Sequence, residues 1–129
     1  MTSKQLDQIY YLSREKRMWE NKLREIPDIS AMRYDGVGGG SGTSSPVASI
    51  AEQREKIREI ISAKLTEISY IEREILGYIG AIDDSLIRQI MTLRHIELKS
   101  WVQVALAVGG GNTADSVRMI HDRYLKEHQ

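Results

Sequence analysis

Residues 50–82 carry an apolar heptad repeat, and this repeat restricts the fold more than any other feature of the sequence. With Ile50 at position a, eight of the ten a and d positions are apolar. These positions are Ile50, Arg54, Ile57, Ile61, Lys64, Ile68, Ile71, Ile75, Tyr78 and Ile82. Such a seam is typical of a long helix in a coiled-coil-like contact. The pattern therefore predicts one helix from about residue 47 to residue 78, with Ile57, Ile61, Ile68, Ile71 and Ile75 as interface residues.

A second helix is predicted over residues 4–26, where Ile9, Leu12, Trp19 and Leu23 recur at helical spacing. Pro27 ends it, because a proline disfavours the helical conformation in the residue before it. The segment 35–46 between the helices holds five glycines and three serines, and it lacks the strand and the lysine of a phosphate-binding loop. It is predicted to be a disordered linker that lets the two helices pair antiparallel.

The helix over residues 4–26 is shorter than the long seam, so part of the seam needs a further partner. Two candidates remain open: a second subunit, and the C-terminal helices of the same chain. Arg54 and Lys64 interrupt the seam, where they either set the register or face acidic side chains of a partner.

Composition excludes several classes of function. The chain has no cysteine, which rules out disulfides and thiolate chemistry. Its three histidines do not form a metal-binding pair at helical spacing, so we expect no metal, no cofactor and no enzymatic activity. No apolar run approaches the roughly 20 residues of a membrane span, so a cytoplasmic protein is expected.

Residues 83–129 change to a pattern of three short helices. Asp83 or Asp84 is placed to cap the first, which is expected to end near Leu98. "SWVQ" at residues 100–103 is a capping box that begins the second, and Gly109 is expected to end it in a left-handed conformation. Asn112 is predicted to cap the third helix. Its buried stripe is expected to hold Val117, Ile120, Tyr124 and Leu125.

Two short helices, a glycine turn and a third helix with a polar leading face favour a helix-turn-helix. The sequence "LRHIELKSWVQVALAVGGGNTADSVRMIHDRYL" resembles region 4 of the sigma-70 family. The matching positions are residues 93–97, 100–105 and 116–118, with Gly109 in the turn and Arg123 in the third helix. The layout of the whole chain is similar to small phage and prophage proteins of Gram-positive bacteria, related to the ArpU and RinA late transcription regulators.

This resemblance implies an all-α fold with two domains. Residues 1–82 would form a long antiparallel helical hairpin, and residues 83–129 a sigma-region-4-like helix-turn-helix. The implied function is transcriptional regulation by binding to double-stranded promoter DNA in the cytoplasm of a bacterial host cell. The hairpin would serve homo-oligomerisation or contact with RNA polymerase.

Base contacts in such a unit come from the start of the third helix, which gives Asn112, Thr113, Ser116 and Arg118 as candidates. Lys99 and Arg123 are placed to meet phosphates. Two plainer interpretations stay open: Asn112 as only a cap, and Arg118 as only a solvated helix residue. Trp101 lies on an apolar stripe and is expected to pack in the core rather than to stack on bases.

The turn "GGGNTAD" is longer than in the family pattern, and only Gly109 has an evident conformational requirement. Val102 and Leu106 replace residues that are polar in the family, which suggests packing against the long helix or another subunit. The apolar Val102 and Leu106, with a net charge of zero, favour an alternative class. In that class the chain is an oligomeric structural or protein-interaction module, or a small-terminase-like DNA-packaging protein. Salt-dependent binding distinguishes DNA binding from helix–helix assembly.

Overall fold

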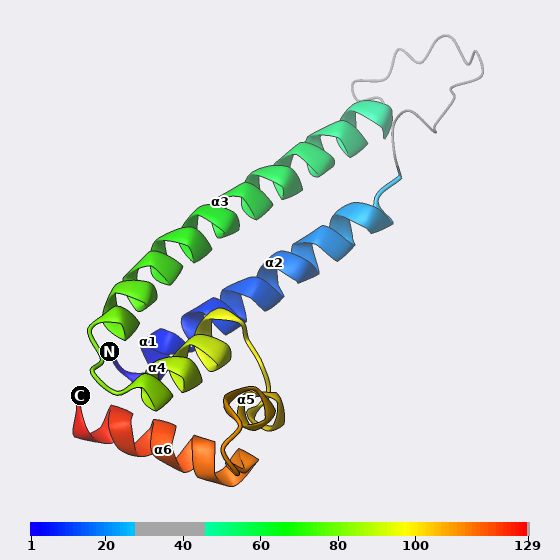
Figure 1. Cartoon of the computed structure of the whole chain (residues 1–129). Helices are drawn as coiled ribbons and strands as arrows, with labels where there is room; N and C mark the ends of the chain where they lie inside the picture. The colour runs from blue at the N-terminus through cyan, green and yellow to red at the C-terminus, as the bar shows by residue number, and fades with distance from the viewer. Residues whose placement is uncertain (28–45, 129) are drawn as a thin grey trace, which may run out of the picture. The chain divides into compact units, whose positions relative to one another are not determined.

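The computed structural model describes residues 1–27 and 46–128, and these residues form helices and turns with no strand (Figure 1). The elements are α1 (Ser3–Leu6), α2 (Gln8–Glu25), α3 (Pro46–Gly80), α4 (Ser85–Met91), a π-helical turn η2 (Thr92–Ile96), α5 (Trp101–Val108) and α6 (Ala114–Glu127). The predicted all-α class is confirmed for the described residues. The predicted linker at 35–46 lies outside them, apart from Pro46.

The long seam forms the single helix α3, slightly longer at both ends than predicted. Gly77 does not interrupt it, because Ile75 and Ile79 on either side are held in the core and outweigh the cost of about 1 kcal/mol for a helical glycine. The predicted first helix is divided at Asp7 into α1 and α2. A capping box between Thr2 and Gln5 begins α1.

Contacts within the chain define two units, which differ from the predicted division at residue 82. The core unit contains Met1–Leu12 with Glu67–Gln129, and the paired-helix unit is Ser13–Thr66. The N-terminal segment and the end of α3 belong to the core unit because they share its apolar core with α4 and α6. That core consists of Leu6, Ile9, Ile75, Ile79, Ile82, Met91 and Leu125.

In the paired-helix unit, α2 and α3 lie antiparallel, and the two residues that interrupt the α3 seam contact α2. Arg54 Nη1 donates to the carbonyl oxygens of Leu23 (3.3 Å) and Ile26 (3.0 Å), where the end of α2 leaves carbonyls without helical partners. Lys64 Nζ lies 3.7 Å from a carboxylate oxygen of Glu15. Arg54 and Lys64 therefore both have partners within the chain, as expected if they set the register of the two helices.

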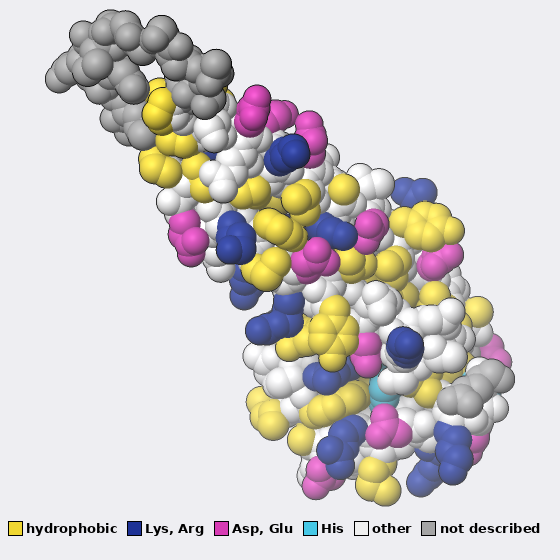
Figure 2. Space-filling model, turned by 180° about the vertical axis from the view of Figure 1, so that it is seen from behind, with side chains coloured by type: hydrophobic (Ala, Val, Ile, Leu, Met, Phe, Trp, Pro, Cys, Tyr) yellow, Lys and Arg dark blue, Asp and Glu magenta, His cyan; other side chains and the backbone are white. Residues whose placement is uncertain are grey.

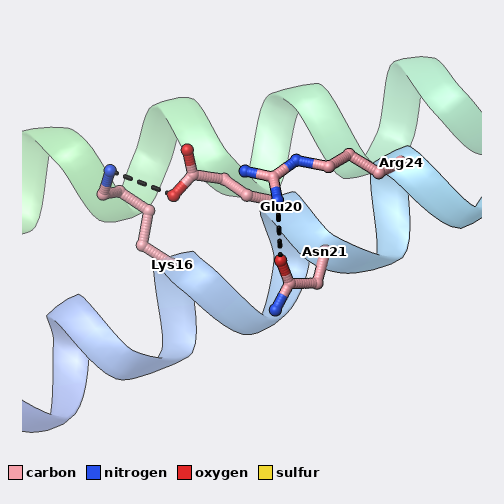
Figure 3. A network of polar contacts seen from close by, with 4 residues as sticks. All are labelled: Lys16, Glu20, Asn21 and Arg24. Carbon is pink, nitrogen blue, oxygen red and sulfur yellow. Dashed lines mark hydrogen bonds and ion pairs between the residues drawn. The ribbon is translucent and has the colours of Figure 1, made fainter.

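Local pairs reinforce the α2 surface in the same unit. Lys16 Nζ lies 3.2 Å from the Glu20 carboxylate, one helical turn away, and Arg24 donates to the Asn21 side chain at 3.2 Å (Figure 3). Each such pair contributes only a few tenths of a kcal/mol. Both pairs lie within α2, so they stabilise that helix and do not join it to α3.

A second apolar cluster joins α4, α5 and α6 in the core unit. Ile90 of α4, Val104 and Ala105 of α5 and Val117 of α6 are buried together, and Trp101 and Val108 pack against them. The predicted apolar stripe on the second short helix is thus confirmed. None of the described helices is long and apolar enough to cross a membrane.

Candidate nucleic-acid interface

The helix α4 begins at Asp84, whose carboxylate accepts from the backbone N–H of Ile87 at 3.0 Å. It ends in the turn η2, where wider hydrogen bonds run from Glu97 to Thr92 and from Lys99 to Leu93. Leu98 follows with a φ of 57°, the left-handed conformation that usually falls to glycine at a helix end. The first short helix therefore ends near Leu98, as predicted, but its last turn is π-helical.

Ser100 and Gln103 form the predicted capping box of α5: the Ser100 hydroxyl accepts from the Gln103 backbone N–H, and the Gln103 side chain accepts from that of Ser100. Lys99, just before it, is half-buried, and its carbonyl accepts from Arg94 Nη1 at 3.0 Å. The Arg94 guanidinium lies 4.4 Å from the centre of the Trp101 ring, a favourable cation–π distance. These contacts fix the start of α5 to η2.

The turn between α5 and α6 uses all three glycines, whereas the sequence indicated a requirement only at Gly109. Gly109, Gly110 and Gly111 have φ values of 65°, 67° and 76°. Gly109 also has a ψ of −148°, in a region that is essentially restricted to glycine rather than the left-handed helical region expected there. A run of three positive φ angles gives the turn a defined backbone path, so the extra glycines do more than lengthen it.

Asn112 does not cap α6, contrary to the prediction. Its side-chain Nδ2 donates to the Gly109 carbonyl at 2.8 Å and so closes the turn. Thr113 is the cap, and it forms a capping box with Ser116: each backbone N–H donates to the other residue's hydroxyl, at 2.8 and 3.1 Å. Thr113 is the N-cap because the side chain of Asn112, one residue earlier, is already hydrogen-bonded within the turn.

The six predicted DNA-contact residues therefore fall into two groups. Asn112, Thr113 and Ser116 lie together at the start of α6, where local hydrogen bonds engage their side chains. Arg118 and Arg123 are exposed on α6, and no hydrogen bond or ion pair joins either to another of the residues 1–27 or 46–128. Lys99 lies apart from both groups, before α5.

The residues Val102 and Leu106 of α5 are 60% and 77% exposed. They do not pack against the long helix of the same chain, which removes one of the two explanations for their apolar character. Charged side chains of both signs lie interspersed on the face drawn in Figure 2, as expected for a chain of zero net charge.

The interface residues predicted on α3 are not equivalent. Ile75 is fully buried in the first apolar core, Ile71 packs at its edge, and Ile57 is 7% exposed. Ile61 and Ile68 are half-buried. The C-terminal helices thus supply the partner for the end of the seam, which was one of the two candidates.

The structure contains a buried histidine pair that the sequence analysis did not predict. His95 of η2 and His121 of α6 are each 3% exposed, with their Nε2 atoms 2.7 Å apart. His121 Nδ1 lies 2.9 Å from an Asp122 carboxylate oxygen. His121 occupies the buried stripe between Val117 and Leu125, while the predicted members Ile120 and Tyr124 are only half-buried.

The signal for this pair was the position of His121, four residues after Val117 and four before Leu125. Burial of a histidine there requires a hydrogen-bond partner, and His95 provides it. Among the described residues, no three His, Cys, Asp or Glu side chains gather as a metal-binding group.

Comparison of the chain with protein-family models, with curated proteins and with solved structures finds no match.

Proposed function

We propose that the chain is a DNA-binding transcriptional regulator of phage type, whose C-terminal helix-turn-helix consists of α5, the glycine turn and α6. The observation that carries this proposal is the placement of Arg118 and Arg123. Both are exposed on a helix that packs, through Val117, into the apolar cluster shared by α4 and α5. A helix held in this way presents its outer face to the major groove.

In this role Arg118 reads a guanine edge, because its position in the first turns of α6 is the one that enters the groove and arginine bonds guanine in a bidentate manner. Arg123 and Lys99 meet phosphates. Thr113 and Ser116 order the start of α6, where free backbone N–H groups of the first turn favour a phosphate. Asn112 acts indirectly, because it closes the turn that orients α6.

The helices α2 and α3 are proposed as a helical hairpin that supports homo-oligomerisation or contact with RNA polymerase in the bacterial cytoplasm. Exposed apolar side chains on α3, at Leu65, Tyr70 and Leu76, support an assembly role. Oligomerisation also compensates for the neutral charge, because each added copy brings its own Arg118 and Arg123 to the phosphate backbone. The proposal assigns no enzymatic activity to the chain.

The direct test is fluorescence anisotropy with a labelled random-sequence duplex of about 30 base pairs, followed by selection of preferred sites from a randomised library. Arg118→Ala is expected to weaken binding to a selected site by about 1–3 kcal/mol and to relax specificity at one base pair. Arg123→Ala is expected to weaken binding to all sequences alike and to lower the salt slope by about 1. The matched control is Arg17→Ala, which removes the same charge from an exposed position on α2.

Undiminished binding by the Arg118→Ala, Arg123→Ala double variant would refute α6 as the reading helix. An equal loss in the Arg17→Ala control would point to nonspecific charge attraction instead.

The alternative is an oligomeric structural or protein-interaction module, including a small-terminase-like packaging protein. Its supporting observation is the exposure of Val102 and Leu106 on α5. Sedimentation of the wild type and of a Val102→Ser, Leu106→Ser variant tests it. An oligomer that dissociates in this variant, in a chain with no salt-dependent affinity for duplex DNA, would favour the alternative.

A further inference from the structure

The buried histidine pair joins α6 to the rest of the core unit. His95 extends from η2 and His121 from the inward face of α6, and their imidazole rings lie 4.9 Å apart between centres. The Trp101 ring meets His121 edge to face, also at 4.9 Å. With Nε2 atoms at 2.7 Å, one ring must donate and the other accept, because two bare or two protonated nitrogens repel at this distance.

The number of protons on the pair decides whether this hydrogen bond exists. In the neutral pair, His121 donates from Nδ1 to Asp122, so its bare Nε2 accepts from Nε2–H of His95. One added proton can be accommodated, since an imidazolium at His121 donates to both Asp122 and a bare Nε2 of His95. A second proton places N–H groups on both Nε2 atoms, which removes the bond and leaves two positive charges in contact.

The groups around the histidine pair further disfavour a second proton on it. Arg94, the neighbour of His95 on η2, is a third positive group, while Asp122 beside His121 is 65% exposed and thus well screened. Asp7, Tyr10 and Tyr11, from the N-terminal segment, line a cavity of about 430 Å³ together with His95 and Arg94. Burial, then the neighbouring His121 and Arg94, lowers the pKa of His95 from 6.5 to about 3.

We propose that the His95–His121 pair is a proton-operated latch, which holds α6 against η2 at neutral pH and raises the population of the form with α6 open in mild acid. The closed form binds fewer protons than the open form between the two pKa values of His95. Closure is therefore fully favoured above about pH 6.5 and is lost progressively as the pH falls toward 3. From neutral pH to about pH 5, the open population rises about 30-fold.

The latch has a consequence for DNA binding that rests on the proposed function. Arg118 and Arg123 lie on α6, on either side of His121. Release of α6 would remove the surface that presents them, and affinity for DNA would fall together with the closed population. The release of α6 itself can be measured without DNA, so the two proposals can fail separately.

The first experiment is native-state amide hydrogen exchange of the full chain at about pH 7.5 and about pH 5, corrected for the intrinsic effect of pH. The expected result is an approximately 30-fold loss of protection in α6, with α3 residues 46–66 of the paired-helix unit unchanged. His95→Gln keeps a neutral hydrogen-bonding side chain and is expected to reduce the loss in α6 to less than about 3-fold. His128→Gln removes the exposed histidine of the same helix and is expected to respond as the wild type does.

Unchanged protection of α6 in acid, equal losses in α6 and α3, or a wild-type response in His95→Gln would each overturn the latch. If His95→Gln does not fold, the imidazole ¹⁵N shifts of the wild type decide: His95 must stay neutral at about pH 5. Ordinary titration of His95 near 6.5 refutes the proposal. Anisotropy of the duplex DNA at both pH values then tests the regulatory consequence. Absence of binding at neutral pH refutes the proposed function and leaves the exchange result intact.

Discussion

Replacement of Gly109 by alanine tests whether the turn between α5 and α6 is a defined structure. Gly109 has a φ of 65° and a ψ of −148°, and an added Cβ would meet no atom within 4 Å. Any destabilisation must therefore come from backbone conformation rather than from a clash. Gly77 provides the matched control, because it lies in the interior of α3 with equally open surroundings.

The expected magnitudes follow from these conformations. A non-glycine residue in the region occupied by Gly109 costs about 1–3 kcal/mol. Alanine also lowers the conformational entropy of the unfolded chain, which stabilises the folded state by about 0.4–1 kcal/mol and offsets part of this cost. Gly109→Ala should therefore lower the free energy of unfolding by about 1–2 kcal/mol. Gly77→Ala should raise it by about 0.5–1 kcal/mol, because alanine is the better helix former.

Urea denaturation of the three proteins, followed by circular dichroism and by tryptophan fluorescence, measures both effects. A Trp19→Tyr background leaves Trp101 as the sole tryptophan, so fluorescence then reports on the core unit. The two substitutions should shift the midpoint in opposite directions with an unchanged urea dependence. If Gly109→Ala is neutral or stabilising, the turn does not require this conformation, and the reasoning about the glycine run is wrong.

The further predictions concern polar contacts. Arg54→Ala should destabilise the chain by about 1–2 kcal/mol in urea denaturation, because it leaves carbonyls at the end of α2 unpaired. Lys64→Ala should cost less than about 1 kcal/mol, as expected for a half-exposed ion pair at 3.7 Å, and an equal or larger loss would contradict this ranking. Thr113→Ala should cost about 1 kcal/mol through loss of the cap of α6, whereas a larger effect from Asn112→Ala would restore Asn112 as the main determinant. Between about pH 7.5 and pH 5, the pKa of about 3 for buried His95 should remove about 2 kcal/mol of the free energy of unfolding of the core unit, a loss that His95→Gln should largely abolish.

The sequence was sufficient for the helices because their signals are local. The heptad seam, the Ser100 capping box and the apolar stripe of α5 each lie within a few turns of chain, and each is present. The pairing of helices was harder to predict, because an apolar stripe does not identify what covers it. Ile75 illustrates this: its periodicity indicated an interface, and only the structure places it against Leu6, Met91 and Leu125.

The histidine pair escaped prediction for a related reason. His95 and His121 lie 26 residues apart, and their Nε2 contact exists only after η2 and α6 have packed. Each histidine alone has the sequence properties of a surface residue, since burial without a partner is unfavourable. The predicted buried stripe of the third helix held Ile120 and Tyr124 in place of His121, although His121 lies four residues from both Val117 and Leu125. Burial of these two histidines therefore depends on a contact between segments that are distant in the sequence.

At the start of α6, unlike at the histidine pair, the polar contacts are local, and they constrain the proposed DNA-binding role. The polar residues at this position matched the family pattern for base contacts, yet Asn112, Thr113 and Ser116 also satisfy the turn and the helix cap. Side chains used in this way position a helix more than they read bases, which leaves Arg118 and Arg123 as the main contacts in the proposed role. The two proposed phosphate contacts per copy, from Arg123 and Lys99, correspond to a salt slope of only about −2. A regulator built on this helix must therefore bind as a dimer or larger assembly to reach the affinity of a specific site.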